Sequence, residues 1–417
     1  MKTFAKISLF VVFLTFAFCA GFAWNDLRLG NAPSGEAFSR LLSGKLDDGP
    51  TPTQLFRANY NLILARFHRP IAPDKLRNAG LEGLFAALGD PHTLFMEPQT
   101  AENFSIETRG NYAGIGARLG ADPLGGSVGT VFKNGPAEKA GLKVGDLITR
   151  VGNIDIAGMA VEEIVTYIRG EEGTSVTLTV MRAGTSDPIK IKVDRAVVVV
   201  PTAEGMMIDG TKVGYIKVDQ FAETTVQQFD TALFDVLRSE PEGLVIDMRG
   251  NPGGLLDTAV LMLSRFIENK TVVTMRERGG RREESRTLTG RKADFAGPIV
   301  VLVDNGSASA SEIFAGVLRD YKRATLVGQH TYGKSTVQTA ILLKDMSTAK
   351  ITTARYYLPS GENFSRVVDE DGTYIRGGIK PEVEVKLDPT VPWEQGVPAK
   401  DAQLAEAIRL VNKKLGR

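Results

Sequence analysis

Two short apolar runs in the second half of the chain each end abruptly in a turn. The first run, Leu244–Met248, leads into the glycine-rich turn Arg249–Gly254. The second run, Ile299–Val303, leads into a loop that contains several serines. Short apolar runs bounded by turn signals are typical of buried strands. After the second run a helix is predicted by apolar residues at helical spacing, namely Ile313, Phe314, Val317 and Leu318.

Other segments show a clear helical or strand period. Helical spacing predicts two helices between residues 56 and 88, one over 161–168 and one over 404–415. The first two are expected to form a small amphipathic bundle. Alternation at Val176, Leu178 and Val180 predicts a half-buried strand. Mixed charge around Gly279-Gly280, within residues 276–292, predicts a solvated hairpin.

The composition excludes several classes of partner and chemistry. The chain has 417 residues, of which 43% are hydrophobic and 24% charged, and its formal net charge is +1. This balance provides no field that would attract nucleic acid or an acidic membrane. The single cysteine is Cys19, so the folded part has no disulfide and no cysteine nucleophile.

The N-terminus has the order of an export signal. Lys2 and Lys6 precede an uncharged, largely apolar stretch that runs from Ile7 to Trp24. This is the order of a secretory signal peptide or a short membrane anchor, and we assign residues 1–24 to one of these. We therefore expect an extracytosolic protein, in the periplasm or on the outer face of the cytoplasmic membrane.

The glycine turn and the serine loop supply the groups that acyl transfer needs. Gly253-Gly254 can present bare backbone amides to a ligand, and Ser307, Ser309 and Ser311 offer hydroxyl groups. A serine before a helix, followed three residues later by Glu312, also fits a simple helix cap. The residues alone do not choose among the three serines.

The chain lacks the histidine motifs of common hydrolases. Its three histidines, His68, His92 and His330, lie in neither a GxSxG elbow nor an HExxH pair. A serine nucleophile then needs another base, and a desolvated, neutral lysine is a recognised one. The candidate is Lys334, which lies among small residues rather than in a charge run. Such a mechanism uses no metal and no cofactor.

From about Tyr60 to Val385 the chain resembles the carboxy-terminal processing (tail-specific) proteases, which are serine peptidases with a PDZ domain. The ordered motifs that carry the resemblance are DPH at 90–92, the PDZ block, DMRGNPGG at 247–254, GSASASEIFAG at 306–316, GKSTVQ at 333–338, LPSG at 358–361 and GIKP at 378–381. The resemblance implies an α/β fold with a crotonase/ClpP-like protease core, a PDZ domain, and helical N-terminal and C-terminal segments. The expected boundaries are 50–100 for the N-terminal helical region, 108–194 for the PDZ domain, 195–390 for the core and 399–417 for the C-terminal helix.

The resemblance also implies a role for individual residues. Ser309 would be the nucleophile, Lys334 the general base, and Gln338 the residue that orients the lysine. The backbone amides of Ala310 and of Gly253-Gly254 would bind the oxyanion.

In the PDZ domain, the resemblance implies that residues 112–117 form the loop that captures a peptide carboxylate. Its members Tyr112, Gly114, Ile115 and Gly116 would present backbone amides and a strand edge to the peptide. Arg169 either opposes the macrodipole of the preceding helix or, as the resemblance implies, couples a docked peptide to the protease core. The expected partners are polypeptides with accessible apolar C-termini, an activating or adaptor protein, and a second copy bound through the terminal helices.

The sequence therefore predicts an extracytosolic serine endopeptidase that recognises polypeptide C-termini and cleaves through an acyl-enzyme on Ser309. One alternative is a catalytically inactive PDZ scaffold with the same fold, which an acylating probe of Ser309 would distinguish. Another is an acyl-CoA enzyme that shares the core and its oxyanion amides, which turnover of a CoA thioester would reveal.

Overall fold

The computed structural model describes residues 50–387, 390–391 and 393–417, and the chain divides into two compact units between Glu97 and Pro98. The predicted signal or anchor segment, residues 1–24, lies outside the described residues. Among the helices that are described, none combines the length and the apolar character needed to cross a membrane.

From residue 50 onward, where it is described, the first unit contains two helices and a short strand, which are α3 (Pro52–Arg66), α4 (Pro73–Ala86) and β1 (Leu94–Met96). Both helices begin at a proline, whose missing N–H removes one of the amides that would lack a partner in the first turn. The helices agree with the predicted periodicity, and they contact each other, since the Tyr60 hydroxyl of α3 donates to the Pro73 carbonyl of α4 at 2.9 Å. Helix α3 buries no residue, and the expected bundle stays a prediction. Seven apolar side chains on or beside the two helices are exposed: Leu55, Phe56, Leu62, Ile63, Phe67, Leu84 and Leu88.

The first part of the second unit contains an antiparallel sheet in the order β3-β4-β5-β7-β8, with β6 paired to β5. Its elements are β3 (Ala117–Asp122), β4 (Gly125–Val131), α6 (Pro136–Lys139), β5 (Leu147–Val151), β6 (Ile154–Asp155), α7 (Val161–Ile168), β7 (Ser175–Met181) and β8 (Ile189–Asp194). The alternate residues Val176, Leu178 and Val180 of β7 are buried, as predicted. They join Ile164 and Ile168 of α7 in one apolar cluster.

The central sheet of the second unit has the order β10-β11-β12-β15-β16-β21, and only β10 runs antiparallel to its neighbour. Its strands are β10 (Ala203–Met207), β11 (Val213–Val218), β12 (Gly243–Asp247), β15 (Ile299–Val303), β16 (Ala324–Gly328) and β21 (Val383–Glu384). The two predicted apolar strands are β12 and β15, and both are buried throughout. Because they are parallel neighbours, with Leu244 opposite Ile299, the glycine turn and the serine loop leave the same edge of the sheet.

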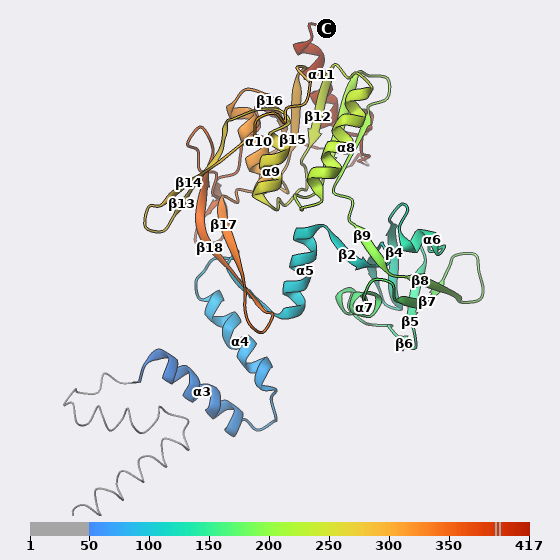
Figure 1. The fold of residues 1–417 in the computed structure, drawn as a ribbon, viewed down its shortest axis with the longest axis vertical. Coiled ribbons are helices and arrows are strands. Elements are labelled where there is room, and N and C mark those ends of the chain that lie inside the picture. The colour runs from blue at the N-terminus through green and yellow to red at the C-terminus, as the bar shows by residue number, and fades with distance from the viewer. Residues whose placement is uncertain (1–49, 388–389, 392) are drawn as a thin grey trace, which may run out of the picture. The chain divides into compact units, whose positions relative to one another are not determined.

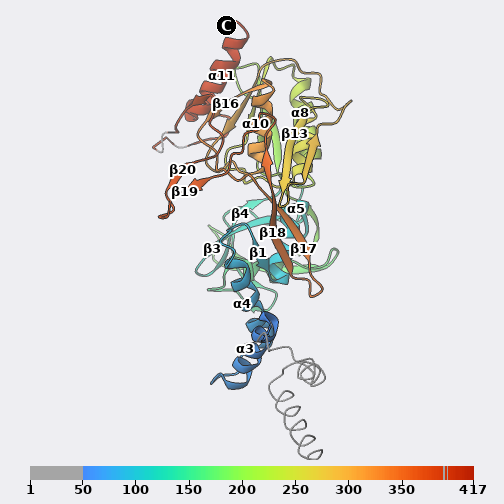
Figure 2. The same ribbon diagram turned by 90° about the vertical axis from the view of Figure 1, so that its left-hand side faces the viewer.

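Helices cover both faces of the central sheet (Figures 1 and 2). They are α8 (Thr225–Arg238), α9 (Leu256–Leu263) and α10 (Ala310–Asp320) on one face and α11 (Ala402–Lys414) on the other. Successive side chains of a strand point to opposite faces. Thus Leu244 and Ile246 pack in the cluster of α8 to α10, whereas Val245 packs with Leu404 and Val411 of α11. The predicted C-terminal helix therefore buries its apolar face against its own sheet.

A second antiparallel sheet of this unit contains β13 (Thr271–Glu277), β14 (Arg282–Arg286), β17 (Thr336–Leu342) and β18 (Thr348–Tyr357). Strands β13 and β14 form the predicted hairpin around Gly279 and Gly280, which both have positive φ. The remaining elements are α5 (Pro98–Arg109), the pair β2 (Asn111–Gly114) and β9 (Ala196–Val199), the hairpin β19 (Val367–Val368) and β20 (Tyr374–Arg376), and the 3-10 helix η1 (Pro398–Lys400).

A buried charge network joins the end of β12 to the start of α11. Arg249 Nη2 lies 2.5 Å from Asp247 Oδ2 and 2.7 Å from Asp401 Oδ2, and Nη1 donates to Gln403 Oε1 at 2.9 Å. The Tyr215 hydroxyl also donates to Asp247. Burial by itself would raise the pKa of Asp247, but the hydrogen bonds and charge of Arg249 hold that pKa below its ordinary value. The network therefore fastens the glycine turn to the C-terminal helix.

Replacing Arg249 by methionine should lower the free energy of unfolding by about 3–5 kcal/mol at neutral pH, the usual effect of removing one partner of a buried ion pair. The deficit should shrink as the pH falls. Since the folded pKa of Asp247 is depressed, its stabilising contribution is full above the unfolded value of about 3.9 and is lost as the pH falls through the folded value. Denaturant unfolding at neutral and acidic pH measures both effects.

The matched control is Arg278→Met, because Arg278 is exposed at the tip of the β13–β14 hairpin. This control should change stability by less than about 0.5 kcal/mol. Equal losses for the two variants would show that the network does not stabilise the fold.

Candidate active site

Ser309 lies where β15 turns into α10, at the N-cap of that helix. Its backbone has φ 55° and ψ −115°, a conformation that residues with a Cβ seldom adopt. A strained serine between a strand and a helix is the geometry of a nucleophile elbow. The chain reaches this geometry without a GxSxG sequence.

The two neighbouring serines have structural roles. Ser307 Oγ donates to the carbonyl of Met248 at 2.8 Å, and Ser311 Oγ donates to the carbonyl of Asn251 at 2.9 Å. Both serines are completely buried, whereas Ser309 keeps 9% of its surface exposed. The hydroxyls of Ser307 and Ser311 thus fasten the serine loop to the glycine turn. This arrangement favours Ser309 as the nucleophile, a choice that the residues alone left open.

The glycine turn packs directly against Ser309. Gly253 and Gly254 have φ of 97° and 140°. A Cβ on Gly253 would stand 2.8 Å from Ser309 Cβ and 2.9 Å from the Ala310 nitrogen, so only glycine allows this approach. The side chain of Asn251 shapes the turn, because its Oδ1 accepts the Gly253 amide at 2.9 Å. The fold therefore brings Ser309, Ala310 and the turn together.

The three amides predicted to bind an oxyanion differ in their partners. Ala310 is the first residue of α10, so its amide has no partner within the helix. The Gly253 amide donates to Asn251. Gly254 forms an isolated parallel bridge with Phe221, in which the Phe221 amide donates to the Gly253 carbonyl. This geometry favours Ala310 and Gly254 as the oxyanion donors.

Glu312 links the serine turn to the loop of the candidate base. Its buried carboxylate accepts the backbone amides of Ser309, Gly333 and Lys334 at 2.8, 2.7 and 2.8 Å, and the Thr331 hydroxyl at 2.5 Å. Burial raises the pKa of this carboxyl, and the hydrogen bonds oppose the shift without cancelling it. The sequence indicated only a helix cap at Glu312. No local signal reveals its bonds to Thr331, Gly333 and Lys334, because folding brings that loop to it.

Lys334 and Gln338 do not share a helical turn. Lys334 lies in the loop before β17 and is half-buried, while Gln338 lies within that strand. Gln338 Nε2 donates to the hydroxyls of Thr336 and Thr352 at 2.8 and 3.2 Å. Glu312 links the backbone of Lys334 to that of Ser309, as described above. The orientation of the Lys334 side chain by Gln338 stays a prediction.

Within the described residues, no group of three or more His, Cys, Asp or Glu side chains is placed to hold a metal ion.

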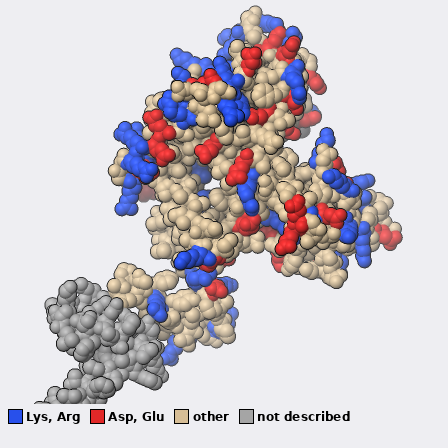
Figure 3. Space-filling model, viewed as in Figure 1, with Lys and Arg blue, Asp and Glu red and all other residues tan. Residues whose placement is uncertain are grey.

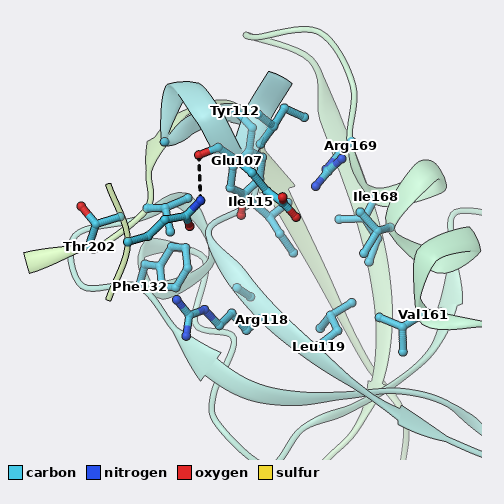
Figure 4. A pocket seen from close by; sticks show the side chains of 16 residues that line it. Glu107, Tyr112, Ile115, Arg118, Leu119, Phe132, Val161, Ile168, Arg169 and Thr202 are labelled. Carbon is cyan, nitrogen blue, oxygen red and sulfur yellow. Dashed lines mark hydrogen bonds between the residues drawn. The ribbon is translucent and has the colours of Figure 1, made fainter. Parts of the chain in front are cut away.

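Three of the predicted PDZ residues, Tyr112, Ile115 and Arg169, line a cavity of about 350 Å³, whereas Gly114 and Gly116 are not among its lining residues (Figure 4). Its apolar walls are formed by Leu119 of β3 and by Val161 and Ile168 of α7, together with Ile115 before β3 and Phe132 after β4. An apolar groove between a strand and a helix suits an extended peptide that adds to the strand edge.

Tyr112 and Arg169 lie together at this cavity. The guanidinium carbon of Arg169 is 5.3 Å from the centre of the Tyr112 ring. The ring also covers Gly114, where a Cβ would stand 2.4 Å from it, and Gly116 has φ 78°. Burial raises the pKa of the Tyr112 hydroxyl, while the charge of Arg169 opposes that shift. The loop predicted to bind a carboxylate thus lies beside the residue predicted to sense it.

Arg169 has contacts that fit both of its predicted roles. It is the C-cap residue of α7, where a cation opposes the macrodipole. Its Nη1 also donates to Asn103 Oδ1 of α5 at 2.6 Å. Its Nε is buried and has no hydrogen-bond partner in the described part of the chain.

Fold and site together define a PDZ-containing serine peptidase. Residues 212–385 match Peptidase family S41, and residues 127–182 match the PDZ domain. The carboxy-terminal processing protease CtpB of Bacillus subtilis (strain 168) is 36% identical over 306 residues, which cover 72% of this chain and 63% of that protein. CtpA of the same organism is 34% identical over 330 residues, which cover 79% of this chain and 68% of that protein. The chain belongs to the carboxy-terminal processing proteases of family S41, as predicted.

A solved structure agrees with the fold. The putative S41 protease from Bacteroides fragilis NCTC 9343 has a TM-score of 0.51 at 18% sequence identity, and the similarity covers 88% of this chain and 99% of that one. The predicted α/β class with a protease core and a PDZ domain is confirmed. The predicted domain boundaries stay predictions.

Proposed function

We propose that this chain is a serine endopeptidase that cleaves polypeptides through Ser309 and Lys334, by way of an acyl-enzyme. One observation carries the proposal: the strained Ser309 packs against the glycine turn on one side and is tied through Glu312 to the Lys334 loop on the other. Backbone strain of this kind costs on the order of 1–3 kcal/mol and persists where function requires it. A catalytically inactive scaffold would have no use for it.

In this mechanism the Ser309 hydroxyl attacks the carbonyl carbon of the peptide bond, and neutral Lys334 takes the hydroxyl proton. The amides of Ala310 and Gly254 stabilise the oxyanion. When the C–N bond breaks, the lysine gives its proton to the leaving amine, and the acyl group stays on the serine. Water, deprotonated by the lysine, then hydrolyses the ester and restores the hydroxyl. Gln338 orients the lysine throughout.

We place the enzyme outside the cytosol because of the lysine-led apolar stretch at residues 2–24. Acidic and basic side chains are interspersed on the face shown in Figure 3, which supports the proposal that the protein does not bind nucleic acid.

A homodimer would use α3 and α4, whose apolar side chains are exposed, because α11 buries its apolar face against its own sheet. An activating or adaptor protein is also proposed, with no surface assigned to it.

The PDZ cavity is proposed to take the C-terminus of the substrate. Its apolar walls suit an apolar last side chain. Of the loop proposed to take the carboxylate through its backbone amides at Gly114, Ile115 and Gly116, Ile115 lines this cavity. Arg169 lies beside this loop and contacts α5, which supports its role in coupling the docked peptide to the core.

A peptide that ends in a free valine carboxylate should bind at least about tenfold more tightly than the same peptide with an amidated end. Hydrogen bonds to a charged acceptor are worth about 1.5–3 kcal/mol, and amidation removes that charge. Calorimetry with the Ser309→Ala protein measures both affinities without cleavage. A free-acid peptide that ends in aspartate is the control for the apolar wall and should bind weakly. Equal affinities for acid and amide would rule out recognition of the end.

A further inference from the structure

Gln220 belongs to the predicted protease core, yet it lines the PDZ cavity. It follows β11 by two residues and is half-buried. Its Nε2 donates to the carbonyl of Glu107 in α5 at 3.3 Å, the bond drawn as a dashed line in Figure 4. A peptide that fills this cavity would therefore meet the core directly, and not only the PDZ domain.

The next residue, Phe221, forms hydrogen bonds through both its backbone amide and its backbone carbonyl to the end of the glycine turn. Its amide donates to the Gly253 carbonyl at 2.9 Å, and its carbonyl accepts the Leu255 amide at 2.7 Å. A Cβ on Gly254 would stand 2.2 Å from the Phe221 carbonyl oxygen, so the two backbones are in close contact. The buried Phe221 ring also packs near Phe314 of α10, with 6.2 Å between ring centres. A shift of Phe221 must therefore move the turn that supplies the Gly254 amide.

Helix α5 is held from both sides of this junction. The Glu223 amide, two residues after Phe221, donates to the Thr108 carbonyl at 3.0 Å. Asn103 of the same helix accepts the hydrogen bond of Arg169 from the PDZ domain. The side chain of Gln220 is one of the points at which this assembly faces the cavity, together with Ile106 and Glu107 of α5. Its bond to Glu107 is long for a hydrogen bond, so a ligand that packs on Gln220 can strengthen it.

We propose that Gln220 is a positioning residue that transmits occupancy of the PDZ cavity to the oxyanion turn. The inference rests on the proposed function. A docked C-terminal tail packs on Gln220 and holds its donation to Glu107. Phe221 and the Gly254 amide are then fixed where the oxyanion forms, so that tail binding raises kcat.

The test uses the full chain, a short chromogenic reporter with an amidated end, and a separate tail peptide that ends in valine. In the wild type the tail should raise kcat for the reporter. Gln220→Met keeps the side-chain length but has no donor. It should bind the tail within about threefold of the wild-type Kd, since one long neutral hydrogen bond contributes little, yet lose most of the stimulation of kcat. Gln220→Lys retains a donor and should retain the stimulation.

The matched control is Gln227→Met, because Gln227 is an exposed glutamine of α8. It should be stimulated like the wild type. Full stimulation of Gln220→Met, or loss of tail affinity together with stimulation, would overturn the inference. If Gln220→Met does not fold, loss of stimulation in a folded Gln220→Lys protein overturns it as well. A wild type that cleaves the reporter and binds the tail without stimulation refutes only this inference, whereas a wild type that neither cleaves peptides nor binds tails refutes the proposed function.

Discussion

Replacing Ser309 by alanine is expected to abolish peptide hydrolysis, with kcat lower by a factor on the order of 10⁴–10⁶. The acyl group can then no longer be attached, and the oxyanion amides alone give only residual catalysis. The fold and tail binding should remain, because a lost helix cap costs at most about 0.5–2 kcal/mol. Chromatographic assay of peptide cleavage and thermal unfolding measure the two effects. An acylating probe should label Ser309 in the wild type and nothing in the variant.

The controls are Ser307→Ala and Ser311→Ala, and both should retain measurable turnover. Each should lower the free energy of unfolding by about 0.5–1.5 kcal/mol, because a buried carbonyl, that of Met248 or of Asn251, loses one of its two donors. Cleavage at the wild-type rate by Ser309→Ala would show that the assignment is wrong. A probe adduct on Ser307 or Ser311 would lead to the same conclusion.

The elements that the sequence predicted well are those whose burial follows from local pattern alone. The strand over Ile299–Val303 and the helix over Val161–Ile168 have the predicted bounds. Each is bounded by residues that stop regular structure, and each has a period that fits one kind of element. The apolar face of α11 was also predicted, but its partner was not. The pattern shows that a face is buried and does not show whether its own sheet or a second copy covers it.

The site was harder to predict, because its parts meet only after folding. The spacing of Lys334 and Gln338 fits one turn of a helix, but residues four apart also lie on one face of a strand. The β-branched residues around Gln338, in TVQTAIL, were the available signal for a strand. The bond from Glu312 to Gly333 spans 21 residues and has no local signature. The resemblance implies that the Gly253 amide is an oxyanion donor, and the sequence does not reveal that Asn251 accepts a hydrogen bond from that amide.

Replacing Lys334 by arginine is expected to inactivate the enzyme as fully as replacing it by alanine. The proton of the serine hydroxyl has to pass to a neutral amine, and a guanidinium keeps its charge at any pH used for assay. The loop should stay in place in both variants, because Glu312 holds it through the Lys334 and Gly333 amides and the Thr331 hydroxyl. The matched control is Lys344→Arg, which changes an exposed lysine and should cleave normally.

The pH dependence separates a lysine base from a histidine base. A lysine in water is protonated at neutral pH, with a pKa of about 10.4, so the active fraction of a lysine base grows as the pH rises. The rate of the wild type should therefore increase along one limb on the alkaline side, and His330→Ala should leave that limb in place. His330 has a buried Nδ1 without a hydrogen-bond partner among the described residues, which makes it the histidine to test. Near-normal turnover by Lys334→Arg, or a folded but inactive His330→Ala, would transfer the role of base to the histidine and return the chain to a Ser-His mechanism.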